Sequence, residues 1–419
     1  MRLTRWVPFA GLLLASAAAV SAQAGQGFFG GMKVNGDLRA YDFTRHYSGP
    51  VAGQSAFSLG GGLNVLSGSV DGFSAGASFY AAHSLGLNNS NPALVDGTLA
   101  GNDAIDTFGQ AFLQYQNRRV LVRAGDQLLS TPWLNASDSR MVPATYQGIF
   151  AAIKPVTGLT ISALRINGFK SRTANHFSQT DLYNSTNIGG SPNPRMAGRT
   201  DPGAAALGVG YHTGGLKVAG WGYEFYDLAK MADAQGAYTF PGGGALKPFV
   251  GGQLIRETGS GAQYLGPVNA TVYGAVIGVK HQSDELSLGY NDLPAHPGAF
   301  GNGDVVSPYT TGYATDPLYT TSMIQGMVDR QTSGHALKVS ATTFFLQHQL
   351  RFIASYAEYY NTLTPSYSSA RTNEVDFDLT YFLKGPLKGL SVRDRVGIAH
   401  NIPHVNRFVY NRLMVEYDF

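Results

Sequence analysis

The sequence predicts an all-β fold: a transmembrane antiparallel β-barrel of about 18 strands with long extracellular loops that fold inward. Three observations lead to it. The composition favours strands and turns, no stretch after an N-terminal leader is apolar enough for a membrane-spanning helix, and about eighteen segments alternate between apolar and polar residues. An exported chain that crosses lipid without helices must close its strands into a barrel, because hydrocarbon offers backbone groups no hydrogen-bonding partner.

The composition also excludes several classes of protein. The 419 residues include 53 Gly, 23 Tyr and 23 Phe but only 14% charged residues, a mixture typical of turned, aromatic-rich strands. The absence of Cys excludes a disulfide scaffold, a thiolate metal site and a cysteine nucleophile. The ten His are dispersed and no acidic Ca²⁺ loop is present, so we expect no metal and no cofactor.

Residues 1–24 have the pattern of a secretory signal peptide. Arg2 and Arg5 precede an apolar run, and cleavage is expected after Ala22 or Ala24, which leaves 25–419 as a single barrel domain. Loss of the two arginines leaves 28 basic against 27 acidic residues, a net charge of about +1. This balance argues against nucleic acid as a partner.

The alternation is clearest in segment 374–382. Large apolar residues at every second position interleave there with Glu374, Asp376 and Asp378. Only a strand places three acids on one face and the apolar residues on the other, which predicts a polar lumen and a lipid-facing wall. The chain ends in the same pattern at Phe419, and a terminal aromatic resembles the signal by which bacterial barrel assembly machinery recognises its clients.

Three long inserts interrupt the pattern, at 82–107, 168–203 and 291–334. Gaps of this length in a regular sheet are usually functional, and in a pore they are candidates to fold inward and narrow it.

Several strings resemble the OprD family of substrate-specific outer-membrane porins. They lie at Leu38-Arg39-Ala40-Tyr41-Asp42-Phe43-Thr44-Arg45, at Ser130-Thr131-Pro132 with Asp138-Ser139-Arg140-Met141-Val142-Pro143, and at Asn373-Glu374-Val375-Asp376 with Gly385 to Arg395. The resemblance implies a Gram-negative outer-membrane channel, a monomer or loose trimer in contact with outer-membrane lipid and lipopolysaccharide. It also implies a ladder of lumen arginines that guides small anionic or zwitterionic solutes, commonly carboxylates. The matching positions are Arg39, Arg123, Arg140, Arg393, Arg395 and Arg412.

Strand parity independently points most of these arginines into the lumen, where a guanidinium can bind a carboxylate and release it. The alternative is that they only pair with lumen acids and stiffen the wall. Asp394 departs from the family pattern because it has lipid-facing parity, so either the strand is at its watery end there or the register shifts locally.

Residues of the 291–334 insert are candidates for the acidic side of a constriction. These are Asp304, Asp316, Tyr319 and Asp329. An extracellular loop without a transport role is the alternative. No catalytic residues are predicted: His281-Gln282-Ser283-Asp284 has suitable residue types, but neighbours in a short turn rarely converge as a triad.

The sequence therefore predicts a substrate-selective channel and not an enzyme. A non-selective or sugar-preferring porin, with Tyr80 or Phe112 along the path, is one alternative. An adhesive or structural barrel is another. The sequence does not identify the solute.

Overall fold

A closed barrel of eighteen antiparallel strands forms the molecule in the computed structural model, which describes residues 27–184, 193–242, 244–365 and 367–419. The predicted signal peptide lies outside the described residues. The strands of the first half are β1 (Lys33–Tyr47), β2 (Gln54–Leu66), β3 (Phe73–His83), β4 (Ile105–Gln116), β5 (Val120–Gln127), β6 (Thr145–Ile153), β7 (Leu159–Lys170), β8 (Ala204–Thr213) and β9 (Leu216–Phe225). The strands of the second half are β10 (Ala229–Thr239), β11 (Leu246–Gly259), β12 (Asn269–His281), β13 (Asp284–Leu293), β14 (Gly334–Phe345), β15 (Leu350–Asn361), β16 (Arg371–Phe382), β17 (Leu390–Ile402) and β18 (Val405–Asp418).

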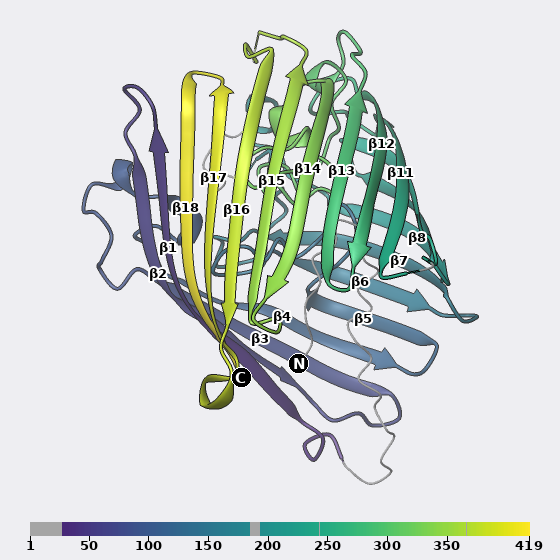
Figure 1. Cartoon of the computed structure of the whole chain (residues 1–419). Coiled ribbons are helices and arrows are strands. Elements are labelled where there is room, and N and C mark those ends of the chain that lie inside the picture. Colours follow the sequence, from purple (N-terminus) through teal and green to yellow (C-terminus); the bar gives the residue numbers. More distant parts are fainter. Residues whose placement is uncertain (1–26, 185–192, 243, 366) are drawn as a thin grey trace.

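Closure occurs between the first and last strands. β1 pairs antiparallel with β18 from Asp37↔Asp418 to Tyr47↔Phe408, and Gly36 and Phe419 exchange backbone hydrogen bonds of 3.1 and 3.0 Å. The C-terminus lies at one end of the barrel, where all the connections are short, and the long connections lie at the other end together with short turns such as that between β17 and β18 (Figure 1). All eighteen predicted segments correspond to strands, so the predicted fold class is confirmed.

In the described part of the chain, the helical content is confined to six short 3-10 turns. They are η1 (Pro92–Leu94), η2 (Gly97–Leu99), η3 (Pro194–Met196), η4 (Phe300–Asn302), η5 (Val328–Arg330) and η6 (Gly385–Leu387). Among the described residues, no helix is long and apolar enough to cross a membrane.

The two faces of the wall differ as the alternation predicts. On β16, Phe377, Leu379 and Tyr381 are exposed on the outside, whereas Glu374 and Asp378 are buried inside. β17 pairs with both neighbours without a shift, so the predicted alternative of a local register shift at Asp394 is wrong. Asp394 faces outward and its carboxylate accepts a 2.6 Å hydrogen bond from the side-chain amide of Asn411.

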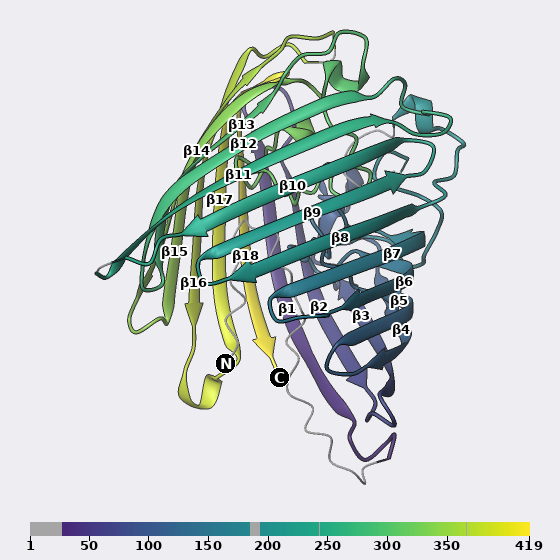
Figure 2. The same cartoon turned by 90° about the vertical axis from the view of Figure 1, so that its right-hand side faces the viewer.

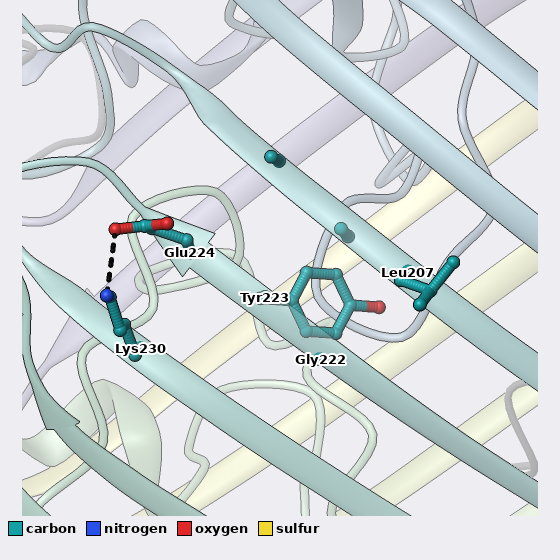
Figure 3. Close-up of a pocket in the computed structure, with 7 residues that line it drawn as sticks. Leu207, Gly222, Tyr223, Glu224 and Lys230 are labelled. Atoms are coloured by element: carbon teal, nitrogen blue, oxygen red, sulfur yellow. Dashed lines mark ion pairs between the residues drawn. The ribbon is translucent and has the colours of Figure 1, made fainter.

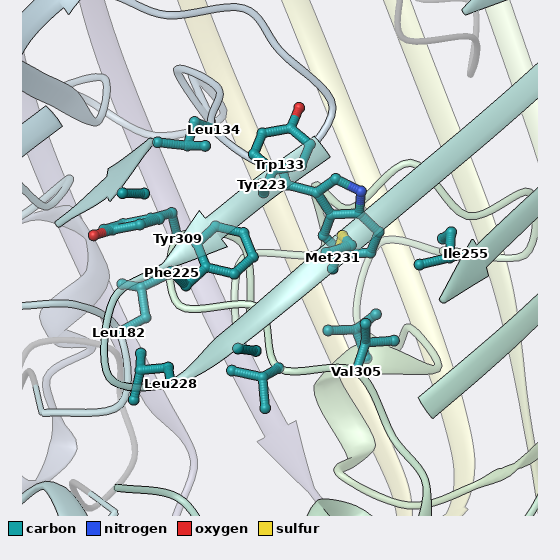
Figure 4. Packing of buried hydrophobic residues seen from close by; sticks show 14 of the residues in the cluster. Trp133, Leu134, Leu182, Tyr223, Phe225, Leu228, Met231, Ile255, Val305 and Tyr309 are labelled. Carbon is teal, nitrogen blue, oxygen red and sulfur yellow. The ribbon is translucent and has the colours of Figure 1, made fainter. Parts of the chain in front are cut away.

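Long connections fill much of the barrel interior. Figure 4 shows Trp133 and Leu134 of connection 128–144 and Val305 of connection 294–333 packed beside inward residues such as Tyr223 of β9 and Met231 of β10. Strands β8–β11, which carry this wall, cross the view in Figure 2. Three long inserts were predicted from the sequence, and connection 128–144 is a further one inside the barrel. It is shorter than the other three, so its length did not distinguish it from an ordinary connection.

Trp221 depends on a glycine for its place in this packing. Its indole covers Gly208 on the adjacent strand, and a β-carbon built there would lie 2.5 Å from the ring. We expect Gly208→Val to displace Trp221 and to cost about 1–3 kcal/mol in stability. The thermal loss of the folded gel band in detergent measures it. Gly222→Ala is the matched control, since a β-carbon at Gly222 meets nothing within 4 Å; an equal loss in both variants would contradict the packing argument.

Candidate functional site

The connection 294–333 is fastened inside the barrel by two acids of β16. The Glu374 carboxylate accepts hydrogen bonds from the backbone N–H groups of Ile324 (2.7 Å) and Gln325 (2.9 Å), and Asp376 accepts one from Met323 (3.2 Å). The Tyr359 hydroxyl of β15 donates to the Gln325 carbonyl at 3.0 Å. A carboxylate that binds successive backbone N–H groups makes strong charge-assisted hydrogen bonds. These lumen acids therefore hold a loop.

Tyr319 and Thr320, which precede the attached residues 323–325, pack against the inner wall where two strands carry glycines. Tyr319, a predicted constriction residue, is buried against Gly274 of β12 and Gly289 of β13, where built β-carbons would come within 3.1 and 2.9 Å of its atoms. The Asn291 side-chain carbonyl accepts a 3.1 Å hydrogen bond from the Thr320 backbone N–H. Residues 319–325 thus follow the inner wall from β12 to β18.

The three predicted loop acids stabilise the loop itself, and of these Asp304 and Asp316 are buried while Asp329 is half-buried. Asp304 accepts from the Val305 backbone N–H (2.7 Å), Asp316 from the Thr321 hydroxyl (2.5 Å), and Asp329 from the Gly312 backbone N–H (2.7 Å). Burial raises the pKa of Asp304. Burial, followed by the nearby Asp316 carboxylate, raises the pKa of Asp329 to about 7. Among the described residues, no ion pair joins these acids to the predicted arginines.

Arg393 and Arg395 share one acid. Asp378 accepts from the Arg393 Nε at 2.9 Å and lies 3.1 Å from the Arg395 Nε, with Arg351 of β15 at 3.9 Å. One negative charge thus faces three positive charges, so this group keeps a net positive charge at neutral pH.

Arg39 is neutralised more completely. Its guanidinium forms ion pairs with Asp37 (2.8 Å), Glu416 (3.0 Å) and Asp138 (2.6 Å), and it donates to the Arg140 carbonyl at 2.9 Å. Because Asp138 and Arg140 belong to connection 128–144, Arg39 fixes this connection to the barrel wall. Asp138 lay within the sequence motif, but nothing local indicated which strand it would reach.

Arg140 and Arg412 form the core of the site. Both are buried, at 6% and 4% exposed, and their guanidinium carbons lie 4.9 and 5.5 Å from the Phe43 ring centre. Arg412 donates to the Met323 carbonyl at 3.3 Å and to the Tyr410 hydroxyl, and it lies directly opposite Arg395 in the β17–β18 register.

Arg172, which the sequence analysis missed, completes this group. It is 5% exposed, its guanidinium carbon lies 3.5 Å from the Tyr313 ring centre, and it donates to the Ser139 hydroxyl at 3.1 Å. Burial, reinforced by the charges of Arg412 and Arg172, lowers the pKa of Arg140. Within the described part of the chain, no carboxylate lies within 4 Å of Arg140, Arg172 or Arg412. We call these three residues the unpaired arginines.

The remaining predicted lumen residues lie on the first strands. Arg123 donates twice to the Gln114 side-chain carbonyl (3.1 and 2.8 Å) and covers the Phe112 ring at 4.2 Å. Tyr80 is buried, and the Gln110 amide donates to its hydroxyl at 3.4 Å. Neither Tyr80 nor Phe112, the aromatic residues named for a sugar-preferring porin, presents an uncovered ring face to a solute.

A closed barrel with loops fastened inside and a charged interior has the architecture of a transport porin. The family model described as outer membrane porin, OprD family, matches residues 26–419, so the chain belongs to this family. Its barrel resembles OccK9 (OpdG) of Pseudomonas aeruginosa, with TM-score 0.79 and 20% identity over 94% of this chain and 99% of that one.

Two further solved structures are similar. A BenF-like porin of Pseudomonas fluorescens Pf-5 has TM-score 0.79 at 16% identity, covering 94% of this chain and 100% of its own. OccK2 (OpdF) of Pseudomonas aeruginosa, solved in complex with glucuronate, has TM-score 0.75 at 17% identity, covering 94% and 99%. No curated protein matched the sequence. OprD-family porins are transport barrels of the Gram-negative outer membrane.

The carboxylate of Glu374 gives a direct test of the loop attachment. We expect Glu374→Gln to weaken the hold on residues 324–325, because a neutral amide replaces a charge-assisted acceptor of two N–H groups. Single-channel recordings should show greater current noise and a larger conductance. Glu358→Gln, which removes an outward carboxylate of β15, is the control and should leave both unchanged. A silent Glu374→Gln variant would refute the attachment.

The raised pKa of Asp329 predicts a pH dependence. With a folded-state pKa near 7, the Asp329 carboxyl is protonated in the folded loop at pH 5. Its contribution to the stability of the folded loop is fully present below the unfolded-state pKa and is lost as the pH rises through 7. Hydrogen exchange of residues 312–330, corrected for intrinsic rates, should therefore increase between pH 5.5 and 8. Asp329→Asn should flatten that increase, whereas Asp71→Asn in a short turn should not. A wild-type profile without this increase would contradict the assignment.

Proposed function

We propose that this protein is an outer-membrane diffusion channel that favours small carboxylate solutes over neutral sugars of similar size. The supporting observation is the set of unpaired arginines, buried in the barrel interior without a carboxylate partner among the described residues. A buried cation is costly unless an anion compensates it. A solute carboxylate would supply that charge transiently.

The arrangement of the other arginines supports a path. Arg395 lies opposite Arg412, and Arg393 lies two residues nearer the periplasmic end of β17. Guanidinium groups in succession let an anion exchange one partner for the next while each contact remains reversible. Asp378 pairs with Arg393 and Arg395 and so weakens their attraction for a solute carboxylate, which favours release of the solute.

Likeness to other proteins points the same way. OccK2 (OpdF) was solved with glucuronate and OpdK with vanillate, and both ligands are carboxylates. At identities of 17% and 18%, these likenesses support a shared fold. The carboxylate substrate class is our proposal for this chain. The signal peptide predicted at 1–24 fits a final location in the outer membrane of a Gram-negative bacterium.

The test compares solutes in proteoliposomes containing the full mature chain. We expect the double variant Arg140→Gln, Arg412→Gln to reduce glucuronate and benzoate uptake by about tenfold or more, the effect of losing about 1.4 kcal/mol or more of attraction, and to leave glucose uptake within about twofold. Arg371→Gln removes an outward arginine paired with Glu358 and should change neither.

Planar-bilayer reversal potentials in a salt gradient give an independent measurement. The wild type should prefer anions, and the double variant should lose that preference. Equal loss of acid and sugar uptake would indicate a general collapse of the pore, and sugar uptake faster than acid uptake in the wild type would favour the sugar-preferring alternative. A wild type impermeable to every solute would favour the adhesive barrel.

A further inference from the structure

Three cations face outward at the extracellular rim of β7–β11. Arg165 of β7, Lys230 of β10 and Arg256 of β11 are all exposed on the outer side of the wall. The strand register places Arg165 opposite Ala205, Ala205 opposite Glu224, and Glu224 opposite Lys230, so the first two cations share one row. Arg256 lies diagonally beside Lys230, at the next outward position toward the periplasm.

We call this group the rim cations, and most of their hydrogen-bond acceptors are uncharged. Arg165 donates to the Pro202 carbonyl at 2.9 Å and to that of Ile166, and Arg256 donates to Asn269 Oδ1 at 2.6 Å and to the Ala270 carbonyl at 2.9 Å. These acceptors are neutral. Among the described residues, the rim cations form one ion pair, between Lys230 and Glu224 at 3.4 Å, and the buried Asp201 carboxylate interacts electrostatically with Arg165.

On the neighbouring strands β15 and β16, one outward cation has an acid partner. Arg371 pairs with Glu358. The outward side chains of the Arg165–Lys230 row and its neighbour carry three cations and one acid, so this sector of the outer rim has a net positive charge.

A hollow in the outer wall lies directly below the rim cations. Figure 3 shows Gly222 between Leu207 on one side and the Glu224–Lys230 pair on the other, and the hollow measures about 410 Å³. It exists because Gly222 has no side chain, and a β-carbon there would meet nothing within 4 Å. A second hollow of about 520 Å³ lies farther toward the periplasm, floored by Gly236 and Gly252 and bordered by Val218 and Leu254.

We propose that this sector is a docking site for lipid A, the phosphorylated and multiply acylated glycolipid at the base of lipopolysaccharide. The rim cations lie above the apolar belt, at the level where the headgroups of the outer leaflet carry phosphate, and Lys and Arg are the side chains that bind phosphate. The apolar hollows lie below, at the level of acyl chains. The rim cations would thus meet the phosphates of lipid A, and the apolar hollows below them would meet its acyl chains.

A second copy of this chain fits the surface poorly. A two-fold contact would bring the rim cations against themselves, because such an interface uses the same patch on both partners. Like charges at that distance repel, so the sector favours an anionic lipid over a two-fold contact between copies of this chain.

The experiment measures lipid retention by native mass spectrometry. Full-length mature protein, purified in detergent and stripped of lipid, is incubated with bis-phosphorylated lipid A, with the same lipid after phosphatase treatment, or with inorganic phosphate. We expect the wild type to retain bis-phosphorylated lipid A at least tenfold more than the Arg165→Gln, Lys230→Gln, Arg256→Gln triple variant. Gly222→Leu, which fills the hollow, should reduce retention several-fold, and Arg371→Gln should not reduce it.

Folding of each variant is checked by the heat-dependent gel shift, and the ion selectivity of the pore serves as a second control because these residues lie outside the lumen. Equal retention by the wild type and the triple variant would overturn the proposal. Equal retention of the dephosphorylated lipid would overturn the role of the cations, and full competition by millimolar inorganic phosphate with an unaffected Gly222→Leu would overturn the role of the hollow.

Discussion

Backbone hydrogen bonding in hydrocarbon is the constraint on which the rest of this structure depends. Every strand must have two neighbours, and the pairing of β1 with β18 provides the last of them. Once the sheet is closed, alternate side chains have only two destinations, lipid or interior. The interior must then accommodate the remaining polar groups, and this chain does so with arginines, acids and inserted loops.

The loops are held by the same acids that would otherwise line the pore. Glu374 and Asp376 bind backbone N–H groups of the 294–333 connection, and Arg39 holds Asp138 of the 128–144 connection. A lumen charge therefore has two possible uses, to fix a loop or to face a solute. The predicted arginines divide accordingly: Arg39 is paired with carboxylates, whereas Arg140 and Arg412 are not.

The strands could be predicted from the sequence because a period of two is a local property. The glutamate and aspartates at 374–378 face the interior as their parity predicts. Inward-folding inserts were predicted, but the paths of the loops could not be, because these depend on contacts between residues far apart in the sequence, such as Arg39 with Asp138, or Tyr410 with the carbonyl of Met323. Arg172 follows the end of β7, where strand parity no longer applies, so only the folded loop reveals its place beside Tyr313.

The apolar filling around Trp133 and Tyr223 lies against β9–β11, while Arg39, Arg395 and Arg412 project from β1, β17 and β18. The number of strands fixes the girth of the cylinder, but packed side chains decide how much of its cross-section remains for water. The width of the aqueous passage is therefore independent of the circumference of the barrel. Natural variation in the inserts can widen, narrow or recharge the passage without altering a single backbone pairing in the wall.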